Sequence, residues 1–200
     1  MSTTETALVS LAEYLEMERL SETRHEYING RVYAMSPGAA DAHHLICWNL
    51  MGALHDQLRN RPCRVYHADM RVKVSPTGMY TYPDIAALCG KPHLENFKGV
   101  DTLLNPSVLI EVLSPTTETY DRGNKFEHYS RLESLQEYVL VPQHRMRVEH
   151  FARDGADWLL SELRDPAAVL RLAPIGCEVP LAEIYRGVEF PPAENSRWPR

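Results

Sequence analysis

The segment of residues 107–113 constrains the fold more than any other part of the chain. Five of its seven residues are apolar, and only Ser107 and Glu111 are polar. A short, nearly continuous apolar run is typical of a strand that is covered on both faces of a sheet. We therefore expect this segment at the centre of the sheet. It falls far short of the ~20 apolar residues that a transmembrane helix needs, as do the other apolar runs, so we expect no membrane span.

Patterns in the rest of the chain predict helices and strands around this segment. The pair Asn29-Gly30 between two short strand-like segments favours a β-hairpin with a type I′ turn. Apolar residues at helical spacing predict helices at residues 9–19, 40–59, 120–132 and 181–185. The expected strands are residues 24–28, 31–35, 64–68, 71–74, 84–88, 107–113, 137–141, 147–152 and 158–163. These elements predict an α/β or α+β fold, with one mixed central sheet flanked by helices, in a single domain over residues 1–200.

The net charge and the absent motifs exclude several classes of protein. With 21 Lys+Arg against 27 Asp+Glu, the formal charge is −6, which argues against a non-specific polyanion binder but leaves room for a local basic groove. The sequence has no HExxH, GxSxG, GxGxxG or complete phosphate-loop motif. The first residues include neither a basic nor an apolar signal segment, so we expect a cytoplasmic protein.

The four cysteines predict no disulfide framework and no zinc finger. Cys47, Cys63, Cys89 and Cys177 are widely spaced, without a CxxC pair and without histidines at zinc-finger spacing. We expect all four to be reduced, buried and structural.

Glu111 is the first candidate for chemistry. Strand alternation places it on the same face as Leu109 and Leu113, where its carboxylate is poorly hydrated. An unpaired charge there is costly, so the fold must supply a cation, a metal, hydrogen bonds or a proton. A structural ion pair with an arginine remains the alternative.

Asp84 is the second candidate, at the start of a predicted strand. It follows Pro83, which costs no ladder hydrogen bond at that position. If this strand lies next to the strand of Glu111, two carboxylates converge at one edge of the sheet, which is how oxygen-rich Mg²⁺ or Mn²⁺ sites are built. Alone, a Pro-Asp pair is also a common turn device.

Lys125 is the third candidate. It shares one helical stripe with Tyr129 and Leu132, at spacings of i+4 and i+7, so its ammonium lies on the apolar side of the predicted helix. Lysines that face a core are uncommon. The alternative is a lysine that extends to solvent. A phosphate loop is excluded because Phe126 occupies the position of the required Ser or Thr.

Six blocks of sequence, in order along residues 11–151, resemble a known family. They are Glu26-Tyr27-Ile28-Asn29-Gly30, His43-x-x-Ile46-x-x-x-Leu50, Tyr82-Pro83-Asp84, Ile110-Glu111-Val112-Leu113-Ser114-Pro115-Thr116-Thr117, Tyr120-Asp121-Arg122-Gly123-Asn124-Lys125-Phe126-x-x-Tyr129 and Gln136-Glu137-Tyr138. This pattern resembles the Uma-two family of bacterial endonucleases, in the PD-(D/E)XK superfamily, with the motif lysine displaced. Leu113 stands where the usual pattern has that lysine.

The resemblance implies a restriction-endonuclease-like core that hydrolyses DNA phosphodiester bonds. Asp84 and Glu111 would hold a divalent metal, Mg²⁺ or Mn²⁺. Lys125 would orient the attacking water, help to deprotonate it or balance charge in the transition state. The resemblance also implies a homodimer.

Three further residues take supporting roles if the family reading holds. Glu26 would be an additional acidic ligand or a neighbour of the ligands, His43 would line the cleft, and Tyr129 would bond a catalytic side chain. The alternatives are a solvated hairpin residue for Glu26, a capping neighbour for His43 and a core residue for Tyr129. Arg122, near a predicted helix start, is expected to be a solvated charge.

A DNA substrate requires local positive charge, and the densest basic stretch is the candidate. It consists of Arg59, Arg61, Arg64, Arg71 and Lys73. The alternative is five charges that face in different directions. Two other functions stay open: a catalytically silent adaptor with a nuclease fold, and a metal-dependent hydrolase of a small phosphoester.

Overall fold

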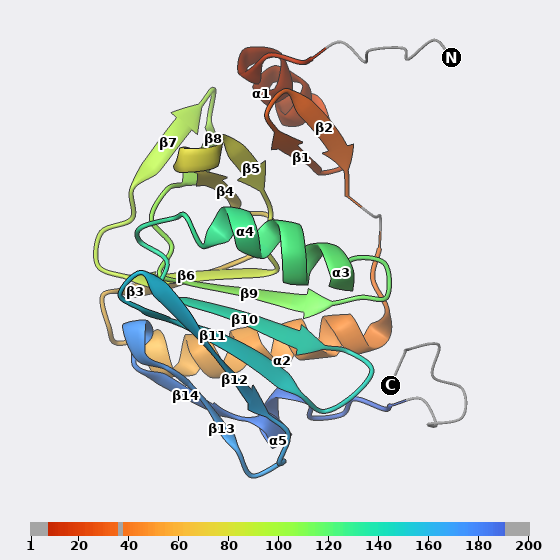
Figure 1. Cartoon of the computed structure of the whole chain (residues 1–200), viewed down its shortest axis with the longest axis vertical. Coiled ribbons are helices and arrows are strands. Elements are labelled where there is room, and N and C mark those ends of the chain that lie inside the picture. The colour runs from red at the N-terminus through yellow and green to blue at the C-terminus, as the bar shows by residue number, and fades with distance from the viewer. Residues whose placement is uncertain (1–7, 36–37, 191–200) are drawn as a thin grey trace.

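The structure is a computed structural model that describes residues 8–35 and 38–190. Within these residues the strands form two six-stranded sheets and one two-stranded sheet (Figure 1). Each six-stranded sheet contains one parallel pair among antiparallel pairs, so both are mixed. The predicted mixture of helices and mixed sheet is confirmed. The prediction of a single sheet is wrong, because short strands that the sequence pattern did not reveal complete a second one.

The central sheet contains the strand at residues 107–113. Its order is β12-β11-β10-β9-β6-β3. The strands are β3 (Cys63–His67), β6 (Ile85–Cys89), β9 (Val108–Leu113), β10 (Glu137–Pro142), β11 (Val148–Asp154) and β12 (Asp157–Leu163). All six residues of β9 are buried, and the strand lies between β10 and β6. The expected position of this segment inside the sheet is therefore confirmed.

The second sheet contains the predicted hairpin. Its order is β2-β1-β5-β4-β8-β7, with β1 (His25–Ile28), β2 (Arg31–Ala34), β4 (Arg71–Val74), β5 (Met79–Thr81), β7 (Leu94–Phe97) and β8 (Val100–Leu103). Asn29 and Gly30 both have positive φ, at 48° and 87°, which a type I′ turn requires. Five strands were not predicted: β5, β7, β8 and the two strands of a small hairpin, β13 (Val169–Leu172) and β14 (Cys177–Pro180). Each has only three or four residues, too few for a clear alternation of polar and apolar side chains.

Helices cover both faces of the central sheet (Figure 1). The long helix α2 (Asp41–Leu58) lies on one face, with the short α5 (Leu181–Ile184) nearby, and the other face carries α3 (Glu118–Tyr120) and α4 (Phe126–Tyr129). A π-helical turn, η2 (Asp121–Lys125), joins α3 to α4. Helix α1 (Leu11–Leu20) packs at the hairpin, and two 3-10 turns are η1 (Ser75–Thr77) and η3 (Ala173–Ile175). No helix of the described residues is long and apolar enough to span a membrane.

Alternate residues of β9 belong to two different cores. Ile110 and Val112 pack in the cluster that includes Leu50 and Leu54 of α2. Leu109 and Leu113 pack in the cluster that includes Tyr129 of α4. Strand alternation therefore points Glu111 toward the α4 side, as the sequence predicts.

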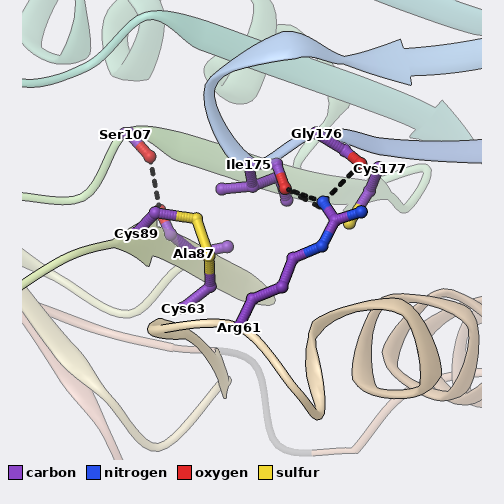
Figure 2. The surroundings of a disulfide bond; sticks show 8 residues. All are labelled: Arg61, Cys63, Ala87, Cys89, Ser107, Ile175, Gly176 and Cys177. Carbon is purple, nitrogen blue, oxygen red and sulfur yellow. Dashed lines mark hydrogen bonds between the residues drawn. A yellow bond between two sulfur atoms is a disulfide. The ribbon is translucent and has the colours of Figure 1, made fainter.

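The expectation that all four cysteines are reduced is wrong for one pair. Cys63 and Cys89 form a disulfide (Figure 2), whereas Cys47 and Cys177 are free. The two bonded residues lie directly opposite each other where β3 pairs with β6. This register cannot be read from cysteine spacing.

A second link lies beside the disulfide. The Arg61 guanidinium donates hydrogen bonds to the carbonyl oxygens of Ile175 and Gly176, at 3.2 and 2.8 Å (Figure 2). It thereby ties the segment before β3 to the β13–β14 hairpin. Arg61 is exposed, but these two bonds hold its guanidinium at the hairpin.

Reduction of the disulfide is expected to lower the free energy of unfolding by about 3 kcal/mol, because the bond closes a long loop in the unfolded chain. The two cysteines are 26 positions apart. Denaturant unfolding of the chain with and without reductant measures the difference. Alkylation of the unreduced, denatured protein should modify only Cys47 and Cys177. Modification of all four cysteines under these conditions would contradict the disulfide.

Candidate functional site

Asp84 and Glu111 lie side by side because β6 pairs with β9. In this antiparallel pair Ile85 is opposite Ile110, and the same register, continued by one residue, sets Asp84 against Glu111. The Asp84 carboxylate accepts a hydrogen bond from the Val112 backbone N–H at 2.7 Å. The predicted neighbourhood of these two strands is therefore confirmed.

Both carboxylates line one pocket, which we call the carboxylate pocket. Its volume is about 770 Å³. Its polar lining includes His43, Asp84, Glu111, Asp121, Lys125 and Gln143. The residues come from α2, β9, the η2 turn and the ends of β6 and β10, so the pocket lies at one end of the central sheet.

The Lys125 ammonium lies among three carboxylates. Its Nζ is 3.0 Å from Glu111 Oε1, 3.2 Å from Asp121 Oδ1 and 3.5 Å from Glu26 Oε1. Only 7% of its side chain is exposed. The alternative that this lysine extends to solvent is therefore excluded, and the helix does deliver the amine to the strand carboxylates.

The helix that carries Lys125 differs from its prediction. Residues 120–132 were expected as one helix, but the helical segment consists of α3, η2 and α4 and ends at Tyr129. The Tyr138 hydroxyl donates to the Asp121 carbonyl oxygen at 3.0 Å, and a side chain that bonds a helix carbonyl interrupts the regular ladder. π-helical turns of this kind are frequent at functional sites.

Glu26 and Tyr129 belong to the same network. Glu26 accepts hydrogen bonds from Thr81 Oγ1 at 2.5 Å and from the Tyr120 hydroxyl at 2.7 Å. It is 6% exposed, so the alternative of a solvated hairpin residue is wrong. The Tyr129 hydroxyl donates to Glu111 Oε1 at 2.9 Å, and its ring is fully buried. Tyr129 is therefore both a core residue and a partner of Glu111.

His43 contacts Asp84 from the α2 side. Its Nε2 is 3.3 Å from Asp84 Oδ2, and its Nδ1 is 3.6 Å from the Cys47 Sγ. Burial alone would lower the pKa of His43, but the hydrogen bond to Asp84 and the charge of that carboxylate raise it above the ordinary value. His43 therefore lines the pocket, as expected.

Negative charge exceeds positive charge around this pocket. Glu26, Asp84, Glu111 and Asp121 supply four carboxyl groups against two basic groups, the Lys125 ammonium and the His43 imidazole. Burial raises the pKa of Glu111 well above its ordinary value; Lys125 lowers it, and Asp121 and Asp84 raise it further. Burial would lower the pKa of Lys125, but the surrounding carboxylates, Glu111 first, raise it.

These oxygens suit a hard divalent cation. The hydrogen bonds that Lys125 and Tyr129 donate to Glu111 both fall on Oε1, so Oε2 is the oxygen that a cation would use. Carboxylate oxygens that exceed the neighbouring cations in charge are the donors that Mg²⁺ and Mn²⁺ prefer. The residues present therefore fit such an ion.

The predicted basic groove does not form. Arg71 is 2% exposed, its Nε donates to Thr102 Oγ1, and its guanidinium lies against the Tyr80 ring. Lys73 forms an ion pair with Glu95 at 2.7 Å. Arg71 and Lys73 share one face of β4, and side chains such as Tyr80 cover that face, which the run of basic residues does not reveal.

The other three members of the predicted groove lie far from the carboxylates. Arg59, Arg61 and Arg64 line a pocket of about 370 Å³ near the disulfide. Arg64 is opposite Leu88, close to the end of β6 that is remote from Asp84. The five cations therefore do not flank the candidate site.

Two other residues differ from their predictions. Arg122 was expected to be solvated, but its guanidinium pairs with Glu149 and Glu118 and is only 27% exposed. Asp121 was not singled out at all. The sequence does contain its signal, because Asp121 stands four positions before Lys125, a spacing that places an acid and a base together on a helix.

Comparisons with known proteins show which family this chain belongs to. A family model, Uma2, described as "Putative restriction endonuclease", matches residues 11–182. Two uncharacterized proteins of Synechocystis sp. are each 32% identical to this chain. The first match spans 183 residues, 91% of this chain and 94% of the relative; the second spans 159 residues, 79% and 89%.

A solved structure has a similar fold. It is a crystal structure from Anabaena variabilis described as a "putative nuclease belonging to DUF820", with a TM-score of 0.72 and 18% identity. The match covers 88% of this chain and 97% of the other. At this identity the likeness shows the fold alone.

Substitution Lys125→Met is expected to lower the free energy of unfolding by about 3–5 kcal/mol near neutral pH, because it leaves buried carboxylates without their cation. Denaturant unfolding measures this. As the control, Lys73→Met removes a more exposed pair and should cost about 1 kcal/mol or less. The loss should shrink as the pH falls below neutral, because the raised pKa of Glu111 lets its carboxyl take a proton. An equal loss for both variants would contradict the buried network.

Proposed function

The chain belongs to the Uma2 family, and on that premise we propose that it is a metal-dependent endonuclease that hydrolyses DNA phosphodiester bonds. The observation that carries the proposal is the meeting of Asp84, Glu111 and Lys125 at one pocket, from two strands and a helical turn. Hydrolysis of a phosphodiester needs an activated water and stabilisation of negative charge on phosphate oxygens, and a carboxylate pair that holds a metal beside a buried ammonium supplies both.

In this proposal Asp84 and Glu111 hold Mg²⁺ or Mn²⁺. When bound, such an ion makes water more acidic and neutralises charge on phosphate oxygens. The Val112 N–H fixes one oxygen of Asp84, and Tyr129 and Lys125 fix one oxygen of Glu111. These bonds hold the two carboxylates in place while each retains an oxygen for the cation.

Lys125 acts as a hydrogen-bond donor and a charge stabiliser in this proposal. Three surrounding carboxylates raise its pKa well above the ordinary value, so it stays protonated near neutral pH. A protonated amine does not accept the proton of an attacking water. It orients that water or stabilises negative charge that develops on the phosphate.

Substrate contact would begin at the turn after β10. Gln143 lines the carboxylate pocket, and Arg145 follows two residues later. Among the residues that the structure describes, Arg145 forms no ion pair within 4.0 Å; the residue is partly exposed, and its Nε is buried without a hydrogen-bond partner. We propose that Arg145 binds a backbone phosphate of DNA.

A hydrolase of a small phosphoester is the second candidate. The dispersed basic groove favours it, because Arg71 is buried and Lys73 is paired. The two functions differ in their dependence on salt, since contacts with several DNA phosphates release counterions and a small ester does not. DNA binding measured at several salt concentrations separates the two functions.

Asp84→Asn and Glu111→Gln are each expected to reduce Mg²⁺- or Mn²⁺-dependent cleavage of plasmid DNA by more than about 100-fold, because each removes a charge that holds the metal. Glu178→Gln, at an exposed carboxylate on β14 that pairs with Arg171, is the control and should cleave normally. Both site variants should unfold cooperatively. Wild-type rates in either variant would overturn the proposed roles, and an inactive wild type that still binds DNA would favour the adaptor.

Arg145→Gln is expected to weaken DNA binding and to reduce the slope of log K against log salt by about 1, as for the loss of one phosphate contact. The measurement is fluorescence anisotropy on a short duplex at several salt concentrations. Arg171→Gln, 74% exposed on the distant β13–β14 hairpin, is the matched control. A flat salt response in the wild type, with hydrolysis of a chromogenic small phosphodiester, would favour the second candidate.

A further inference from the structure

A second set of metal-ligand atoms adjoins the carboxylate pair. His43, Cys47 and Asp84 each offer one ligand atom, and these atoms all lie within 4.8 Å of one another. His43 and Cys47 are one turn apart on α2, at i and i+4, so the helix holds both toward β6. Cys47 is one of two free cysteines, and the proposed nuclease mechanism does not use it.

The geometry fits a tetrahedral ion. Two ligands at about 2.0–2.1 Å from a tetrahedral Zn²⁺ lie about 3.3 Å apart. His43 Nε2 and Asp84 Oδ2 are 3.3 Å apart, so an ion can replace the proton that these atoms share. The Cys47 Sγ lies 3.6 Å from the other ring nitrogen of His43 and belongs to the same group of ligand atoms within 4.8 Å of one another. The side chains of His43 and Asp84 are 16% and 17% exposed and line the carboxylate pocket, so an ion can enter from there.

A Cys-His-Asp nucleophilic triad explains these contacts less well. Burial raises the pKa of the Cys47 thiol, and the charges of Asp84 and Glu111 raise it further, so the thiol is protonated and unreactive. Cys47 is also absent from the lining of the carboxylate pocket. The raised thiol pKa does not prevent metal binding, because a coordinating thiol is deprotonated by its metal.

The donor types select a different metal from the carboxylate pair. Imidazole, thiolate and one carboxylate suit Zn²⁺, with a fourth position left to water, whereas Mg²⁺ and Mn²⁺ prefer oxygen ligands. We propose that His43, Cys47 and Asp84 form a binding site for Zn²⁺ or a similar thiophilic divalent cation, and that a cation there, because it shares Asp84, repels the ion that Asp84 and Glu111 would hold and inhibits hydrolysis. The inhibitory part rests on the proposed function, and the binding part does not.

Titration of the full chain with Co²⁺ tests the binding part. The probe is cobalt alone, added to chelator-treated protein in anaerobic buffer without thiol reductant. The wild type should develop the near-ultraviolet absorption of a thiolate–cobalt bond. Cys47→Ser should lose it, and Cys177→Ser, at the other free cysteine, should retain it. Absorption that is absent from the wild type, or unchanged in Cys47→Ser, would overturn the site.

Calorimetry with Zn²⁺ supplies a second readout. Because loss of a ligand costs at least as much as loss of an outer partner, Cys47→Ser and His43→Gln should each weaken Zn²⁺ binding at least about tenfold. Matching thermal unfolding of Cys47→Ser and wild type shows that the fold is intact. Unchanged Zn²⁺ affinity in both variants would place the ion on the carboxylates alone and contradict the proposal.

Cleavage assays test the inhibitory part. With Mg²⁺ in excess, low concentrations of Zn²⁺ should inhibit the wild type, and Cys47→Ser should need at least about tenfold more Zn²⁺ for the same inhibition. Equal inhibition of both proteins would overturn this part. A chain that cleaves no DNA but shows the Cys47-dependent cobalt band would refute the proposed function and leave the binding site standing. A chain that cleaves DNA without that band would refute the binding site and leave the proposed function standing.

Discussion

The antiparallel pairing of β6 with β9 is the constraint on which the candidate site depends. The register that sets Ile85 opposite Ile110 also sets Asp84 against Glu111, and a slip of one residue would turn every side chain of β6 to the other face. Two cores hold this register, because alternate residues of β9 pack against helices on opposite sides of the sheet. The same hydrophobic packing that stabilises the fold therefore positions the carboxylates.

Charge balance is the second constraint. Desolvation of a carboxylate such as Glu111 costs free energy, and the attraction of the nearby Lys125 offsets only part of it. Burial raises the pKa of Glu111 even with the ammonium at 3.0 Å. An arrangement with more buried acids than bases gains from a further cation, which is a physical reason for metal affinity at this position. The hairpin contributes through Glu26, so the second sheet also supports the pocket.

Much of this site was predictable from local pattern. Alternation in an apolar strand located Glu111, and a helical stripe located Lys125, because both arguments depend only on residues a few positions apart. Features that depend on which strands pair across long stretches of sequence were not predictable. The Cys63–Cys89 bond and the division into two sheets follow from which strands pair. The inward turn of Arg71 depends on what covers β4, so a cluster of basic residues in sequence did not become a cluster in space.

The location of a bound cation tests the central claim most directly. Crystals soaked in Mn²⁺ would be measured near the manganese absorption edge, so that anomalous scattering identifies the ion. The account predicts a peak between the carboxylates of Asp84 and Glu111, with Lys125 Nζ still hydrogen-bonded to Glu111. A peak elsewhere in the molecule, or an ammonium that has left Glu111 for solvent, would contradict it.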